Sequence, residues 1–180
     1  DVLRSACKYR GLAYGLYNMI NRTAWDVGAK SFAELGHGAR MINFYTYGPY
    51  PDACDTQSQR REIYPILQEF THAAGAVEDE ILNSAPIRSK VALVYSHTTD
   101  LWDLIPRKGL FGEELMGLYL LLRHLGYPLD VLTEDDVLAG RADGYEALFV
   151  TGSHLRDGVP ARLLDWASRG GLLYLGAGAG

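Results

Sequence analysis

Residues 90–95 read Lys-Val-Ala-Leu-Val-Tyr, a short continuous apolar run that predicts a strand buried on both faces. Similar apolar runs follow at 129–132, 147–150 and 172–175. Helical spacing marks the segments at 113–126 and 160–168. Because strands alternate with helices and lack polar alternation, the second half predicts an α/β fold with a parallel, flavodoxin-like sheet. A polar loop is expected at 96–107.

Two residues indicate where helices of the second half begin. Thr133 is followed by acidic residues, which is typical of a helix cap, because negative charge is favourable at a helix N-terminus. Pro160 stands at the start of another helical segment, where its missing N–H costs nothing.

The first half repeats the alternation of helix and strand. Helices are expected at 2–10, 26–37 and 59–81, and strands at 12–20 and 39–47. Pro65 falls in the first turn of the long helix or kinks it. This order is typical of a βα barrel or a doubly wound sheet. A linker at 83–88 divides the chain into two predicted domains, 1–85 and 86–180.

Composition excludes several classes of protein. The chain of 180 residues has 17 Lys and Arg against 22 Asp and Glu, so it lacks the basic excess that nucleic-acid binding needs. The longest apolar runs fall far short of the ~20 residues of a membrane-spanning helix, and no signal peptide is visible. Cys7 and Cys54 are too few for a disulfide framework or a metal site, which favours the cytoplasm. The chain stops directly after a predicted buried strand, so we expect a fragment, truncated at both ends.

Two small-molecule sites can be weighed in the second half. Residues 96–100 resemble the phosphate loop of flavodoxins in composition, but residues 101–109 are expected to separate them from the next helix. No flavin or other cofactor is therefore predicted. Ser153 and His154 lack a Gly-x-Ser-x-Gly context, and neighbours in sequence are not expected to face each other as nucleophile and base. A turn is the expected role of this pair.

Several motifs together resemble one family. In the second half these are the strands at 90–95 and 145–150 and the segment at 164–173, which contains Trp-Ala-Ser-Arg-Gly-Gly. In the first half they are Trp25 and the segment at 33–44, which contains Gly-His-Gly-Ala. In order and spacing, the chain resembles beta-galactosidases in which a TIM barrel is followed by an amidotransferase-like trimerisation domain. The resemblance implies that 1–85 are the last strands and helices of a (β/α)8 barrel and 86–180 an incomplete trimerisation domain.

The resemblance also implies an activity, the retaining hydrolysis of a glycosidic bond by two carboxylates. In the family the acid/base follows barrel strand four, which would lie upstream of Asp1, and the nucleophile is a Glu that ends strand seven. The strand at 12–20 ends in Tyr17-Asn18-Met19-Ile20-Asn21, with no carboxylate. The catalytic residues are therefore expected outside this chain and stay unassigned. A relocated nucleophile, or a non-catalytic carbohydrate-binding or assembly protein of the same fold, is the alternative.

Substrate-binding residues are expected where barrel active sites form, at the carboxyl ends of the strands. Aromatic rings stack on sugars and carboxylates accept bonds from sugar hydroxyls, which leads to five candidates: Tyr47, Tyr50, Trp25, Asp52 and Asn18. Alternate tyrosines of this strand could instead pack between barrel and helices. The family's galactose-binding Glu and His have no match at 48–61. By the family, a homotrimer with a carbohydrate substrate is expected, without metal, nucleic acid or membrane.

Overall fold

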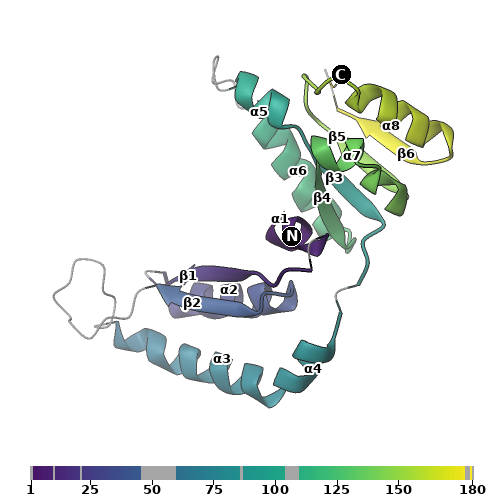
Figure 1. The fold of residues 1–180 in the computed structure, drawn as a ribbon. Coiled ribbons are helices and arrows are strands. Elements are labelled where there is room, and N and C mark those ends of the chain that lie inside the picture. The colour runs from purple at the N-terminus through teal and green to yellow at the C-terminus, as the bar shows by residue number, and fades with distance from the viewer. Residues whose placement is uncertain are drawn as a thin grey trace. The chain divides into compact units, whose positions relative to one another are not determined.

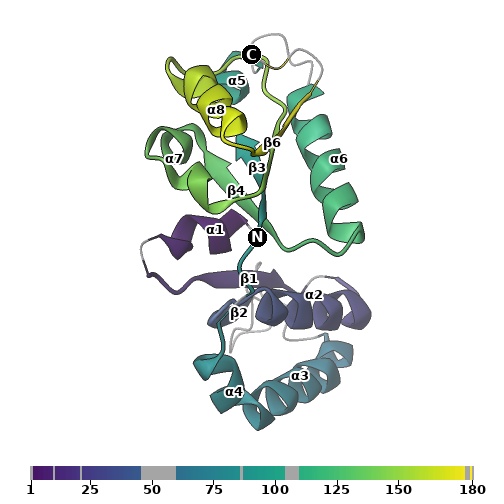
Figure 2. The ribbon, with the colours of Figure 1, turned by 90° about the vertical axis from the view of Figure 1, so that its right-hand side faces the viewer.

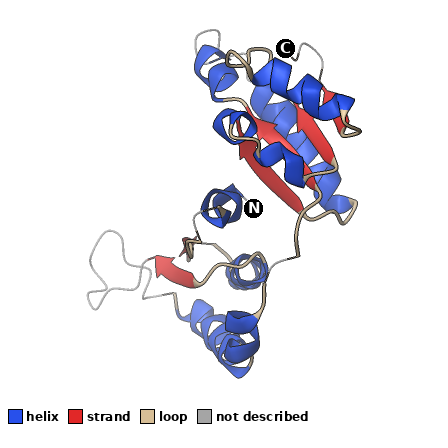
Figure 3. Ribbon diagram, turned by 45° about the vertical axis from the view of Figure 1, so that its right-hand side comes forward, coloured by secondary structure: helices blue, strands red, loops and turns tan. Residues whose placement is uncertain are grey.

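The computed structural model describes residues 2–9, 11–20, 22–45, 60–85, 87–103, 110–176 and 179. It is an α/β structure with two separate parallel sheets (Figure 3). The chain forms two compact units. Residues 7–86 make up one, which we call the small-sheet unit. Residues 1–6 and 87–180 make up the other, the large-sheet unit, so the first six residues belong with the second half of the chain.

The small-sheet unit is a βαβ unit followed by helices. Strand β1 (Gly15–Met19) pairs in parallel with β2 (Met41–Tyr45), and helix α2 (Ala24–Gly36) connects them. Thr23 and Asp26 cap the start of α2 reciprocally, because each side chain accepts a hydrogen bond from the other residue's backbone N–H. The short helix η1 (Arg61–Ile63) then leads into α3 (Tyr64–Ala76) and α4 (Glu78–Asn83).

The long helix expected at 59–81 is broken into these three elements. Pro65 lies in the first turn of α3, as the sequence predicts. The break between α3 and α4 falls at Val77, whose backbone leaves the helical region with φ −125° and ψ 23°. A run of three acidic residues follows and favours a new helix N-terminus at Glu78.

Helices α2 and α3 cover one face of the two-stranded sheet. Ile20, Val27 and Ile63 form the buried centre of this layer. Phe70 of α3 packs edge-on against Phe44 of β2, with ring centroids 6.0 Å apart. Among the described residues, no helix of this unit covers the opposite face, which we call the bare face. Besides the partly buried Asn43, it carries four exposed side chains, Tyr17, Met19, Met41 and Tyr45.

The large-sheet unit contains a four-stranded parallel sheet in the order β4-β3-β5-β6 (Figure 1). The strands are β3 (Val91–Tyr95), β4 (Leu129–Thr133), β5 (Ala147–Val150) and β6 (Leu172–Leu175). The connecting helices are α5 (His97–Asp103), α6 (Leu110–His124), α7 (Glu134–Leu138), η2 (Arg141–Gly144) and α8 (Val159–Ser168). Figure 2 shows α6 on one side of the sheet and α7 and α8 on the other, so the parallel sheet expected from 90–95 onward is confirmed.

Helix starts in this unit follow their capping residues. Thr133 and Asp136 form a capping box at the start of α7, which confirms the predicted cap. Pro160 lies in the first turn of α8.

The prediction of a polar loop over 96–107 is wrong for residues 97–103, which form α5 directly after β3. Residues 104–107 lie outside the described residues. Ser96 Oγ accepts a hydrogen bond from the backbone N–H of Thr99, at 3.0 Å, and so supplies a partner that the first turn of a helix needs. A second partner comes from Glu134, which is distant in sequence and accepts from the N–H of Thr98 at 3.2 Å.

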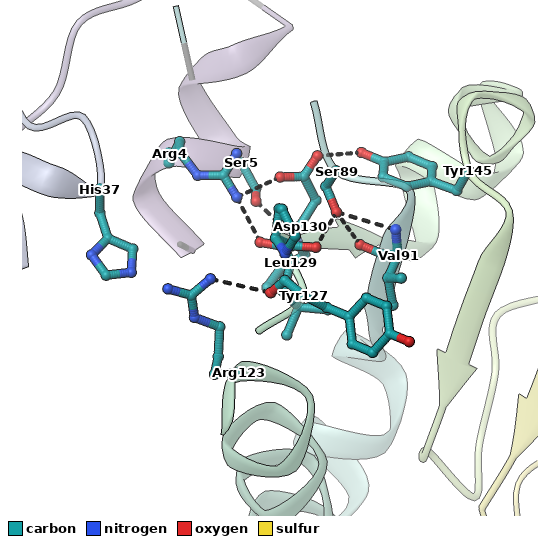
Figure 4. Close-up of polar contacts among 12 residues, drawn as sticks. Arg4, Ser5, His37, Ser89, Val91, Arg123, Tyr127, Leu129, Asp130 and Tyr145 are labelled. Carbon is teal, nitrogen blue, oxygen red and sulfur yellow. Dashed lines mark hydrogen bonds and ion pairs between the residues drawn. The ribbon is translucent and has the colours of Figure 1, made fainter. Parts of the chain in front are cut away.

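The first helix of the chain hydrogen-bonds to the edge strand of the large sheet. Helix α1 (Val2–Lys8) carries Arg4 and Ser5 to the outer side of β4 (Figure 4). Ser5 Oγ accepts from the N–H of Val131 at 2.9 Å, and Arg4 donates to the carbonyl of Leu129 at 2.6 Å. These contacts occupy backbone groups that an edge strand otherwise leaves open.

Arg4 also enters a buried ion pair. Its guanidinium lies 2.6 Å from a carboxylate oxygen of Asp130, whose side chain is 1% exposed. The hydroxyl of Tyr145 donates to the other oxygen of the same carboxylate at 2.8 Å. Figure 4 shows Arg4 and Tyr145 approaching Asp130 from two sides. The carboxylate is thus held by groups from α1 and from the segment just before β5.

Candidate functional site

The bare face of the small sheet is richest in exposed aromatic surface at its carboxyl end. Met19 and Tyr45 are partners in register at that end, and Tyr17 lies one step further back on the same face. The rings of Tyr17 and Tyr45 meet edge to face, with centroids 6.1 Å apart and planes at 82°. They are 65% and 38% exposed. Each exposed ring offers an apolar face beside a phenolic hydroxyl, a combination that can contact a sugar ring.

Charged groups stand at the same end of the sheet. The Arg60 guanidinium donates to the carbonyl of Ile20, directly after β1, at 3.0 Å, and to Glu62 Oε1 at 2.9 Å. The pKa of the Glu62 carboxyl lies below its ordinary value, because its own backbone N–H and the Arg60 guanidinium stabilise the charged form. An ionised carboxylate and a guanidinium are therefore placed at the carboxyl end of β1, where they can hydrogen-bond to hydroxyl groups.

Neither Arg60 nor Glu62 is among the residues predicted from the sequence to bind substrate. Both fall in the segment 59–81, which was expected to form one long helix. The available signal was position, since both residues follow a strand of the parallel sheet and precede the proline-marked helix α3. What fixes them at the end of β1 is a contact over 40 positions of sequence, from Arg60 to Ile20.

The predicted binding residues have different surroundings. Tyr47, Tyr50 and Asp52 lie outside the described residues. Trp25 is in the first turn of α2, directly after the carboxyl end of β1, and its side chain is 77% exposed. Its position is at the same end of the sheet as Tyr45, and its role in binding a substrate stays a prediction.

Asn18 lies on the covered face of the sheet, beneath α2. Its amide nitrogen donates to the carbonyl of Val27 at 3.1 Å and to Ser31 Oγ at 2.7 Å, and the residue is fully buried. In this structure the side chain connects β1 to α2. A contribution of Asn18 to substrate binding also stays a prediction.

Replacing Asn18 with Ala is expected to lower the free energy of unfolding by about 1–3 kcal/mol, because two buried hydrogen bonds are lost. Urea unfolding followed by circular dichroism measures the change. Asn43→Ala is the matched control, since Asn43 lies on the bare face of β2 and is only partly buried. An equal loss in both variants would contradict this structural role of Asn18.

Ser153 and His154 correct one expectation. Although they are neighbours in sequence, Ser153 Oγ lies 3.0 Å from His154 Nδ1, so the two side chains do face each other. The contact is exposed, and the imidazole lies near the Trp102 indole with ring centroids 6.4 Å apart. A nucleophile and its base also need a third group that orients the base, and the described residues supply none at this histidine.

A hollow of about 250 Å³ lies at the amino edge of the large sheet. Trp166 and Tyr145 contribute to its lining, and Arg169 stands beside it in ion pairs with Asp143 at 2.8 Å and Asp165 at 3.2 Å. Open parallel sheets bind ligands at their carboxyl edge, so this hollow is not the candidate site.

The described part of the chain contains neither a metal-binding cluster nor a helix suited to cross a membrane. No group of three or more His, Cys, Asp or Glu side chains is arranged to hold a metal ion there. Within the same residues, no helix combines the length and the apolar character that crossing a membrane requires.

The fold and the site define an α/β protein with two parallel sheets and an aromatic, charge-flanked surface on the smaller one. No protein-family model matches the chain, and no curated protein is significantly similar to it.

Proposed function

We propose that this chain is the C-terminal part of a retaining glycoside hydrolase similar to the beta-galactosidases, in which a (β/α)8 barrel precedes an amidotransferase-like domain. One observation carries the proposal. Among the described residues, the helices of the parallel βαβ unit cover one face of its sheet, and the bare face presents Tyr17 and Tyr45 toward the carboxyl end. In a closed barrel this face lines the interior, and the carboxyl ends of the strands form the active site.

In this proposal the described residues bind substrate rather than break the bond. Tyr45 and Trp25 provide aromatic surface, and Glu62 accepts hydrogen bonds from sugar hydroxyls. The two carboxylates of a retaining mechanism stand about 5–5.5 Å apart on either side of the scissile bond and belong to other strands of the barrel, outside this chain. The reaction needs neither a metal ion nor an organic cofactor.

The large-sheet unit acts in assembly in this proposal. Its strand order has β3 in the middle and β4 at the edge, which corresponds to the first four strands of the flavodoxin-like order 2-1-3-4-5. Helix α6 exposes the large apolar side chains of Met116, Leu120 and Leu121, and Leu125 directly after the helix is exposed as well. Surfaces of this kind are typical of subunit contacts, and the family resemblance favours a homotrimer.

Cys7 carries a free thiol, which suits the cytoplasm.

Turnover of aryl glycosides by the complete natural protein tests the activity. We expect release of the aryl alcohol from at least one β-glycoside, with retention of configuration at the anomeric carbon by NMR. Absence of turnover on every sugar of the panel would contradict the proposal. Sugar binding by calorimetry without turnover would instead favour a carbohydrate-binding or assembly protein of the same fold, a role that the lack of a carboxylate at the end of β1 supports.

The variant Tyr45→Ala is expected to raise KM about two- to tenfold in that assay, since an aromatic contact contributes about 0.5–1.5 kcal/mol. Met41→Ala is the matched control. Met41 lies on the same face of the same strand but at its amino end, and its replacement is expected to leave KM unchanged. Equal effects of the two variants would show that the carboxyl end of the sheet is not the binding site.

A further inference from the structure

The carboxyl edge of the large sheet has the topology of a ligand site. Strand β3 connects to β4 on one side and has β5 on its other side, so the strand order reverses at β3. In open parallel sheets, ligands bind outside the carboxyl ends of the strands at such a reversal. The segments that meet there are 96–99 after β3, 134 after β4 and 151–156 after β5.

Two of these segments are fastened together. Ser96 Oγ and Thr99 Oγ1 both donate to the carbonyl of His154, at 2.6 and 2.7 Å, and the N–H of His154 lies 2.9 Å from Thr99 Oγ1. Gly152 permits the close approach, because a Cβ there would lie 2.5 Å from Thr99 Oγ1 and 2.7 Å from Ser96 Cβ. These contacts bring the loop after β5 directly onto the start of α5.

The carboxylate of Glu134 fills the centre of this edge. One oxygen accepts from the N–H of Arg156 at 2.9 Å and lies 3.1 Å from Ser96 Oγ, whose single proton goes to the closer carbonyl of His154. The other oxygen accepts from the N–H of Thr98 at 3.2 Å and from its hydroxyl at 2.9 Å. The residue is only 4% exposed. Three neutral donors, from the start of α5 and from the loop after β5, thus surround a buried oxyanion, as in protein sites that bind free anions.

The charge of this carboxylate is held by hydrogen bonds. Burial alone would raise the pKa of Glu134, but the bonds from Arg156, Thr98 and Ser96 outweigh it and hold the pKa below its ordinary value. The Arg156 guanidinium is directed to Asp135, and among the described residues no Lys or Arg side chain pairs with Glu134. Thr151 Oγ1, buried at the same edge, has no hydrogen-bond partner in the described part of the chain.

We propose that the large-sheet unit contains an oxyanion-binding site at its strand reversal and that Glu134 is its built-in ligand. The site consists of the Ser96 hydroxyl and the backbone and hydroxyl donors of Thr98, with the N–H of Arg156. A free anion can enter only where this side chain is removed or displaced. The class of free ligand is a small carboxylate or inorganic phosphate. The proposal is independent of glycoside hydrolysis.

Anion rescue of the full chain tests the proposal. Glu134→Ala is expected to lower Tm by roughly 10 °C, because three buried donors lose their acceptor. Formate at a tenfold excess over its Kd is expected to raise the Tm of Glu134→Ala by about 5 °C. The same formate concentration is not expected to raise the Tm of the unchanged protein by a comparable amount. Acetate and inorganic phosphate, measured separately, determine which anion fits the site.

Asp135→Ala is the matched control, because it removes one negative charge from the same helical turn at a largely exposed position. If formate raises Tm equally in both variants, the effect is general to anions and the proposal is overturned.

The pH dependence of Tm gives a second readout, which also serves if Glu134→Ala fails to fold. The pKa of Glu134 is lower in the folded protein than in the unfolded chain, so its ionised form stabilises the folded state above pH 4.5. This stabilisation is lost as the pH falls through the pKa of the folded protein. Between pH 6 and pH 4, the Tm of Glu134→Gln is therefore expected to fall less than the Tm of the unchanged protein. Equal losses overturn the proposal. The other charged or titratable groups on the surrounding elements are Asp135, Asp136, His97, Asp100, His154 and Arg156, and both proteins retain them.

Discussion

Arg4→Met is expected to lower the free energy of unfolding of the large-sheet unit by about 3–5 kcal/mol. The reason is the burial of Asp130, whose side chain is 1% exposed and lies 2.6 Å from the Arg4 guanidinium. Without the guanidinium, a buried negative charge loses a cation in direct contact with it. The carbonyl of Leu129 on the sheet edge loses a donor as well.

Urea unfolding of the full chain, followed by tryptophan fluorescence, measures this loss. Arg156→Met is the control, since it breaks an exposed pair with Asp135 and is expected to cost less than ~1 kcal/mol. The double variant Arg4→Met/Asp130→Asn also removes the buried negative charge, so it is expected to recover part of the lost free energy of unfolding. If Arg4→Met and Arg156→Met are equally stable, the first helix does not belong to this unit in solution.

Leu93→Ala is expected to destabilise the same unit by about 2–5 kcal/mol. Leu93 is 1% exposed in the central strand β3 and belongs to the buried cluster with Val91, Leu122 and Leu129. Truncation removes apolar contacts between the sheet and α6 and leaves a cavity that a closely packed parallel sheet cannot collapse to fill.

Leu120→Ala provides the comparison within α6. Leu120 is 47% exposed, so its truncation is expected to change the free energy of unfolding by less than ~0.5 kcal/mol. The same urea unfolding experiment measures both variants. A comparable loss of unfolding free energy from Leu120→Ala would mean that the side chain of Leu120 is covered in the protein as it exists in solution.

Local chemistry was sufficient to predict most elements of the fold. The apolar run at 90–95 and its three successors became β3 to β6, because buried parallel strands need continuous apolar sequence. Thr133 and Pro160 marked helix starts correctly, since capping depends on groups within one turn of the chain.

Predictions failed where the deciding contact is distant in sequence. Helix α5 was expected to be a loop, and its first turn is supported by Glu134, 36 positions further along the chain from Thr98. Ser153 and His154 were expected to point apart, yet their side chains are in contact. Propensities within a short window carry no information on such partners.

The candidate site follows the same division. The sequence predicts the site at the carboxyl ends of the first two strands, and its aromatic candidates are Trp25, Tyr47 and Tyr50. It did not reveal that Arg60 would bond to the end of β1, or that Asn18 would face α2. A strand's alternation allows two orientations, and only packing of the helices against one face selects between them.

The sequence by itself determined the α/β class, the parallel strands and the starts of α7 and α8, since these depend on burial patterns and capping over a few residues. Only the tertiary structure decided that the first six residues join the second half of the chain, where Arg4 meets Asp130 across 126 positions. It alone also placed Glu134 among the donors of α5. Both contacts compensate a buried charge, and the partner of a buried charge is fixed by where the chain folds back.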